Sequence, residues 1–326
     1  MGCRPAVTIW RELPDAADSM ESLTKIVRRP ALGAALAGWA LAACALAAGP
    51  ALAGSPPAAP TVFHAEASQA FNRYIQLTEE RIAQEIRPGG AFLTMDRLPA
   101  DARIAAYTAL RGGELRMERV ETKDNGQAID CPGGIIHHWV GVVFIPGATM
   151  EMTMRMIQDY DHQADVYAPQ VVRSKTISHA GDDFHIYMRL REKEVITVVL
   201  DTEHDAHFDR LDPQRIASSS VSTRVQQVED AGEPNEHDLP AGQDSGYLWR
   251  INSYWRFLER DGGVYMQCES VSLTRNIPTG LGWIIRPLIE SIPRDLLRAT
   301  LDHTRRGLAR ARAVTGANAT NVASGG

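Results

Sequence analysis

Cysteine and aromatic residues are both scarce in this chain of 326 residues. Four cysteines are too few for a scaffold held together by disulfides. Aromatic residues make up only 6% of the chain and gather late in it. The formal net charge is −6, so the chain lacks the excess of basic residues that phosphate binding requires. This excludes nucleic acid as a main partner. With 44% hydrophobic and 23% charged residues, the composition is that of a globular protein.

The common motifs of catalysis and of phosphate or metal binding are missing as well. The chain has no glycine-rich phosphate loop and no G-x-S-x-G, H-E-x-x-H or C-x-x-C motif. Its densest group of metal-ligand residue types is DTEHDAHFD, which contains His204 and His207 but no third histidine or cysteine nearby. We therefore expect no catalytic residue of a known motif, no metal site and no cofactor.

The N-terminal 53 residues have the pattern of a secretion signal. A basic stretch at residues 25–29 precedes an uncharged, Ala- and Leu-rich run over residues 31–48, and a Gly-Pro pair ends this run. Small residues then occupy the −3 and −1 positions of a cleavage site after Ala53. The sequence predicts export to the periplasm or the bacterial cell envelope, with cleavage near Ala53.

Two other interpretations of this segment stay open. Leu41-Ala42-Ala43-Cys44 resembles a lipobox, in which Cys44 is acylated and becomes the first mature residue. A retained membrane anchor is the other, since the apolar run is at the lower limit for spanning a bilayer. Met20 would begin a signal of ordinary length, so residues 1–19 are candidates for a mis-assigned start.

After the signal, the chain reads as helices, then strands, then a long helix. Residues 54–62 form a Pro- and Ala-rich linker, residues 63–110 a helical segment, residues 111–313 the main domain, and residues 314–326 a disordered tail. Apolar spacing predicts helices over 63–86, 100–110 and 148–160, and a last helix over 281–313 that Pro287 and Pro293 interrupt. The predicted strands are 114–122, 134–145, 170–179, 183–191, 194–204, 215–229, 246–259 and 263–275.

The last two strands form a hairpin around Asp261-Gly262, a sequence typical of a type I′ turn. This turn pairs Arg260 with Gly263 and Trp255 with Cys268. One face of the hairpin then carries apolar residues with small residues between them, and the other face carries the charges. We expect the first face to point inward. Its serines either fit beneath bulky side chains of the last helix or line a ligand cavity, where their hydroxyls would orient a polar group of the ligand.

This order of elements resembles the helix-grip fold of the superfamily that contains START lipid-transfer domains, Bet v 1 allergens and polyketide cyclases (SRPBCC). The stretches that carry the resemblance are IHHWVGVVFIPGA at residues 136–148 and the run from Ser253 to Leu297. The resemblance implies an α+β fold, in which a curved antiparallel sheet wraps around a long C-terminal helix and leaves a hydrophobic cavity. The predicted lining is Trp249, Ile251, Ser253, Trp255, Phe257, Val264, Met266, Ser270, Ser272, Leu297 and Leu301.

Three functions are compatible with these features. The first is an exported START-like protein that binds or carries a lipid or another hydrophobic small molecule. The second is a cyclase- or hydrolase-type enzyme that uses the same cavity, and the third is a non-enzymatic envelope protein with a filled core. The basic side of the last helix makes peripheral contact with a membrane a further expectation. Cys131 and Cys268 form a disulfide or remain two separate thiols.

Overall fold

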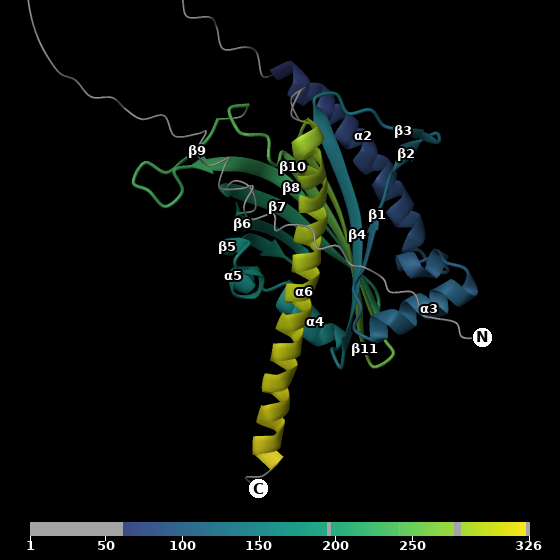
Figure 1. Cartoon of the computed structure of the whole chain (residues 1–326). Helices are drawn as coiled ribbons and strands as arrows, with labels where there is room; N and C mark the ends of the chain where they lie inside the picture. Colours follow the sequence, from purple (N-terminus) through teal and green to yellow (C-terminus); the bar gives the residue numbers. More distant parts are fainter. Residues whose placement is uncertain (1–60, 194–196, 241, 277–281, 324–326) are drawn as a thin grey trace, which may run out of the picture. The chain divides into compact units, whose positions relative to one another are not determined.

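The computed structural model describes residues 61–323 except 194–196, 241 and 277–281 (Figure 1). The predicted signal and its alternative lipidation site at Cys44 lie outside these residues. Two helices and a short 3-10 turn precede the sheet: α2 (Thr61–Glu85), η1 (Thr94–Arg97) and α3 (Ala100–Arg111). They confirm the helices that apolar spacing predicted for this segment.

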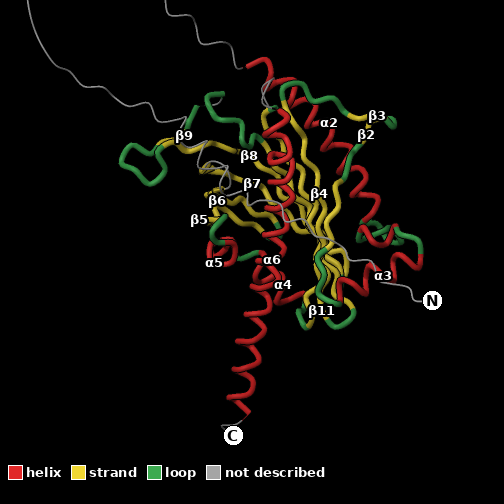
Figure 2. Tube along the Cα trace, in the orientation of Figure 1, coloured by secondary structure: helices red, strands yellow, loops and turns green. Residues whose placement is uncertain are grey.

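All the long strands belong to one antiparallel sheet (Figure 2). Its order is β1-β4-β11-β10-β8-β7-β6-β5, and β9 pairs with β8. The helices α4 (Met150–Ile157) and α5 (Gln163–Tyr167), with the turn η2 (Tyr160–His162), lie between β4 and β5. The strands are β1 (Arg116–Arg119), β4 (Gly134–Pro146), β5 (Val171–Ala180), β6 (Asp183–Lys193), β7 (Thr197–Asp212), β8 (Arg215–Glu229), β9 (His237–Asp238), β10 (Arg250–Arg260) and β11 (Gly263–Arg275), with a separate pair β2 (Lys123–Asp124) and β3 (Gln127–Ala128).

The hairpin of β10 and β11 has the predicted register. Arg260 faces Gly263 and Trp255 faces Cys268. Both turn residues have positive φ, 57° for Asp261 and 73° for Gly262, as a type I′ turn requires. The apolar face points towards α6 (Gly282–Ala323) and is called the α6 face below. Its buried side chains form one cluster with α4 and α6, which includes Phe257, Val264, Met266, Cys268, Leu297 and Leu301.

The opposite face of the hairpin, which carries the charged residues, is also buried, whereas we expected only the first face to point inward. Arg256, Gln267 and Glu269 have at most 1% of their surface exposed. They are covered by α2, η1 and α3, whose apolar side chains form two further clusters with this face. We call it the α2 face. The alternation of apolar and polar residues cannot show whether a helix packs on the polar face of a strand. The same pattern is expected for a strand with one face exposed to solvent.

The C-terminal helix is longer and less interrupted than the sequence predicts. α6 runs unbroken through Pro287 and Pro293 and ends at Ala323, whereas we expected a broken helix ending at Ala313 and a disordered tail. A proline inside a helix costs about 3 kcal/mol relative to alanine, so other interactions of the helix have to offset this cost. The residues after Ala313 include Gly316 but no proline, which is the residue that most strongly interrupts a helix.

α6 approaches β4 closely at Gly141. A Cβ atom at this position would lie 2.4 Å from Cδ1 of Leu301 and 2.8 Å from Sδ of Met117. Both distances are shorter than van der Waals contact, so only glycine lets the helix lie this close to the strand. The absence of a side chain at Gly141 therefore lets Leu301 pack directly against β4.

Gly141→Ala is expected to lower the free energy of unfolding by about 1–3 kcal/mol, because the added methyl group overpacks the contact with Leu301. Urea denaturation measures this. In a Leu301→Ala background the space is vacated, so the same substitution should then be much less destabilising. Purely additive effects of the two substitutions would contradict the proposed contact.

Candidate functional site

The predicted cavity lining divides into two parts. Five of its residues are at most 5% exposed and belong to the solid core under α6: Phe257, Val264, Met266, Leu297 and Leu301. They fill the space that we expected to be hollow at this end of the sheet. The other residues of the lining lie further along β10 and β11, where Ile251, Ser253, Trp255 and Ser270 are only partly buried.

Trp249 does not belong to the lining at all. It precedes β10 and packs against the cluster on the α2 face. Its indole Nε1 donates a hydrogen bond to Asp244 at 3.0 Å, and the guanidinium of Arg275 lies over its ring. The period-two pattern of aromatic residues placed it with Trp255, but the strand begins only at Arg250, so alternation does not extend to it.

Serines from three neighbouring strands meet on the α6 face beyond the core. Ser253 on β10 faces Ser220 on β8 and Ser270 on β11. Together with their neighbours they form what we call the serine surface, which consists of Ser218, Ser220, Ser222, Ser253, Ser270 and Ser272. The sequence predicted three of these six, since it did not show that β8 lies next to β10.

Two indoles flank the serine surface. Trp255 on β10 faces Ser218 on β8, and Trp139 on β4 faces Ser270 on β11. Both are partly buried and pack against the core at its edge. The hydroxyls of Ser220, Ser253 and Ser270 make no hydrogen bond to another described residue, and their side chains are partly accessible. Small polar groups between large rings leave room for a ligand and offer it hydrogen bonds.

Two buried histidines lie on the α6 face in the cross-strand row that contains Ser272 and Ser222, one at each end of this row. His137 faces Ser272, and its Nε2 lies 3.0 Å from Oγ1 of Thr274. His204 faces Ser222, and its Nε2 lies 3.1 Å from Oγ1 of Thr202. Burial lowers the pKa of each imidazole to about 4, so both are neutral near pH 7.

The histidines do not form a catalytic pair or a metal site with one another. Four strand spacings of about 4.8 Å put the two backbone positions about 19 Å apart along the sheet. His207, which we considered together with His204, lies three residues further along the same strand and therefore points to the opposite face. No cluster of three His, Cys, Asp or Glu side chains suited to a metal occurs in the part of the chain that the structure describes.

The two cysteines are separate thiols. Cys131 packs beside Phe71 and Leu273 in a cluster on the α2 face, whereas Cys268 is in the core on the α6 face. Burial raises the pKa of the Cys131 thiol to about 11, and it raises the pKa of Cys268 too. The side chains point to opposite sides of the sheet, which leaves the pairing alternative without support in the structure.

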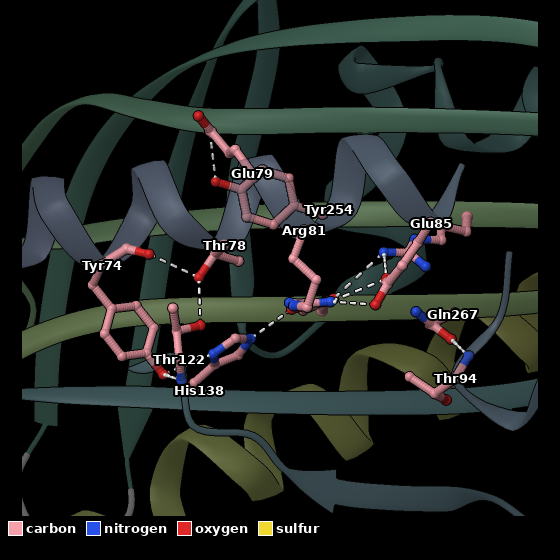
Figure 3. A network of polar contacts seen from close by, with 12 residues as sticks. Tyr74, Thr78, Glu79, Arg81, Glu85, Thr94, Thr122, His138, Tyr254 and Gln267 are labelled. Carbon is pink, nitrogen blue, oxygen red and sulfur yellow. Dashed lines mark hydrogen bonds and ion pairs between the residues drawn. The ribbon is translucent and has the colours of Figure 1, made fainter. Parts of the chain in front are cut away.

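A network of buried polar and charged side chains connects α2 to the sheet (Figure 3). Tyr74, Thr122 and His138 lie at one end of the view, Gln267 and Thr94 at the other, and Arg81 with Glu85 between them. The sequence indicated none of these contacts, because they join residues that are far apart in the chain. In the sequence, the network is indicated only by the glutamate and arginine residues that alternate with apolar residues along the last two strands.

Glu269 on β11 is central to this network. Its Oε1 accepts hydrogen bonds from Nε2 of His138, at 2.7 Å, and from Nη2 of Arg81. Burial by itself raises the pKa of this carboxyl, but the bond from His138 and the charges of Arg81 and Arg256 outweigh burial, and the pKa lies at about 2. Glu269 is therefore ionised although only 1% of its surface is exposed.

Glu85, at the end of α2, is the second anion of the network. Its carboxylate accepts from Arg256 at 2.6 Å, from Arg97 at 2.8 Å and from Arg81 at 3.0 Å. Arg256 also donates to the backbone oxygen of Phe92 at 2.8 Å. Removal of one partner from such a buried group leaves an unpaired charge, which typically costs about 3–5 kcal/mol. The network therefore fixes the end of α2 and the segment after it on the sheet.

Two open hollows on the surface lie away from the serine surface. One, of about 460 Å³, lies between the end of α4 and the β5–β6 turn and includes Asp159, His179 and Arg210. The other, of about 440 Å³, lies beside α3 and includes Arg103 and Arg260. Most of their charged side chains are paired with neighbours, for example Arg210 with Asp182. Neither hollow contains a residue of the predicted lining.

No protein-family model matches the chain, and no curated protein matches its sequence. Solved structures are similar to it at low identity. A protein from Thermus thermophilus is 14% identical over 55% of this chain and 98% of its own, with a TM-score of 0.37. A STAR-related lipid transfer protein fragment from Xanthomonas axonopodis is 14% identical over 58% and 98%, also with a TM-score of 0.37. The Zhui aromatase/cyclase from a Streptomyces species is 11% identical over 54% and 95%, with the same TM-score.

The chain has a START-like helix-grip fold. Its own order and pairing of elements define it: an antiparallel sheet, helices inserted after β4, and a long C-terminal helix along the sheet. The expected fold class is thus confirmed. None of the helices in the described residues contains an apolar stretch that suffices to cross a membrane.

We expect acid to destabilise the protein in two pH ranges. The folded-state pKa of His137 and His204, about 4, is below the ordinary 6.5, so stability falls as the pH drops from about 6.5 to 4. The folded-state pKa of Glu269, about 2, is below the ordinary 4.5, so its contribution is complete above about pH 5 and is lost below that. Urea midpoints measured from about pH 7 to pH 3 test both.

Glu269→Gln should remove the loss of stability below about pH 5, which amounts to about 3 kcal/mol of unfolding free energy at most. It should leave the loss between about pH 6.5 and 4 unchanged. The double variant His137→Gln/His204→Gln should do the reverse. An unchanged slope between about pH 4.5 and 3 in Glu269→Gln would contradict the ionised state of the buried carboxyl.

Proposed function

We propose that this protein binds a hydrophobic small molecule or a lipid on the α6 face, against the serine surface. The observation that carries the proposal is the row Ser220, Ser253 and Ser270, whose hydroxyls are accessible and bonded to no other described residue. Trp139 lies at one end of this row, and Trp255 lies two residues from Ser253 on β10. The flanking rings provide apolar contact area, and the hydroxyls orient polar groups of the ligand.

Several features favour a binding protein over an enzyme. The described lining contains no pair of titratable groups within reach of one another, and its two histidines are held neutral at opposite ends of one row. General acid–base catalysis needs such groups within hydrogen-bond distance of one reacting site. The similar structures include one named a lipid transfer protein and one named an aromatase/cyclase, so the choice between the two functions rests on the residues of this chain.

Export belongs to the same proposal. Residues 1–53 have the pattern of a cleaved signal, which would deliver the domain to the periplasm or cell envelope. Membrane contact through α6 stays a prediction. Several of its arginines are engaged within the chain, for example Arg305 with Asp302 and with the backbone oxygen of Gly113, which leaves the exposed Arg298, Arg306 and Arg310 for such contact.

A matched pair of substitutions on β8 tests the binding site. Ser220→Leu fills the serine surface, while Ser219→Leu adds the same volume one residue away on the opposite face of the strand. We expect Ser220→Leu to weaken the binding of a fluorescent fatty acid or a fluorescent sterol at least tenfold and Ser219→Leu to leave it nearly unchanged. Equal effects of the two, or no binding of either probe by the wild-type protein, would refute the proposal.

Expression of the full chain in a Gram-negative bacterium tests export. The expected product is found in the periplasm and has a mass that corresponds to cleavage near Ala53. A lipid-modified product that begins at Cys44 would support the lipobox alternative, and an uncleaved cytoplasmic product would refute export.

A further inference from the structure

The layer between α2 and the sheet contains polar atoms that the network leaves without partners. Three of these atoms are Nε of Arg256, Nε2 of Gln267 and Oε2 of Glu269. Each of the three residues is at most 1% exposed, so bulk water does not reach them. A buried donor or acceptor without a partner costs about 1–3 kcal/mol, and natural proteins seldom leave several together.

These atoms come from neighbouring positions of the same face. Arg256 on β10 and Gln267 on β11 face one another in register, and side chains in such pairs start about 5 Å apart. Glu269 follows Gln267 by two residues and points to the same side. Its Oε2 lies 3.8 Å from Nη2 of Arg256, which is too far for a direct hydrogen bond.

The rest of each side chain is held in place by other contacts. Arg256 donates from its two terminal nitrogens to Phe92 and Glu85, and Oε1 of Gln267 accepts from the backbone nitrogen of Thr94 at 2.8 Å. Oε1 of Glu269 already accepts from His138 and Arg81. The unpartnered atoms therefore cannot turn to pair with one another without breaking these bonds.

We propose that one structural water molecule binds between Arg256, Gln267 and Glu269. It accepts hydrogen bonds from Nε of Arg256 and from Nε2 of Gln267, and it donates one to Oε2 of Glu269. Three hydrogen bonds are typical of a buried water in a globular protein. The water completes the coordination of the Glu269 carboxylate and joins β10 to β11 beneath the end of α2.

The chemistry of the site favours water over an ion. An anion such as chloride would accept from the two nitrogens, but the ionised Oε2 of Glu269 would repel it. An ammonium or metal cation would be repelled by Arg256 and would find no acceptor on Nε2 of Gln267. Only a molecule that both accepts and donates satisfies all three atoms.

A high-resolution crystal structure of the protein, with a second crystal soaked in bromide, tests the site. We expect a single density peak within hydrogen-bond distance of the three atoms and no anomalous signal at that peak. An anomalous bromide peak would show an anion in place of water. A site without density, in which the three side chains pair directly, would also overturn the proposal.

Water-selective NMR provides a second test that does not depend on crystals or variants. Side-chain protons on Nε of Arg256 and Nε2 of Gln267 should show direct cross-peaks to a long-lived water. The control is Gln163, a buried residue whose Nε2 donates to the backbone oxygen of Ile157 at 2.8 Å and should show no such cross-peak. Absence of the cross-peaks from both Arg256 and Gln267 would contradict a bound water.

Discussion

The burial of both faces of one sheet is the constraint on which the rest of the structure depends. α6 covers one face with apolar contacts, and α2 covers the other through apolar clusters and the charges around Glu269. Most residues of β10 and β11 are therefore buried against a neighbour on one side of the sheet or the other. The ion pairs determine where α2 lies, because moving it would leave Arg256 and Glu269 buried without compensation.

This arrangement separates the buried charges from the proposed binding surface across the thickness of the sheet. The α2 face holds the ionised groups in a closed layer, where they are engaged in hydrogen bonds within the chain. The core of the α6 face is apolar, and beyond the core the face becomes a surface of serines and indoles, with Arg119 on β1 in register with Trp139 at its edge. Gly141 lies near the boundary between the apolar core and the serine surface. It allows Leu301 of α6 to approach β4 closely, and the serine surface begins a few residues further along the strand.

The sequence predicted the pairing of neighbouring strands in the last hairpin well. It predicted poorly which helices and strands pack against that hairpin. The Asp261-Gly262 turn fixed the register of the last hairpin, so Phe257 and Met266 could be assigned to the same buried face. The strand β8 carries three further serines of the site, yet nothing local indicates that it pairs with β10. Likewise Arg256 and Glu269 look like solvent-facing charges until α2 is placed over them, because alternation reports which residues share a face and not what lies on it. Trp249 was misassigned since the strand begins one residue after it.

The most direct test of the central claim is an experimental structure of the protein bound to an apolar probe that it retains in solution. The account predicts ordered probe density against Ser220, Ser253 and Ser270, in contact with the rings of Trp139 and Trp255, with α2 and its charge layer unmoved. Density for the probe elsewhere, or a serine surface fully packed by the chain's own side chains, would contradict it.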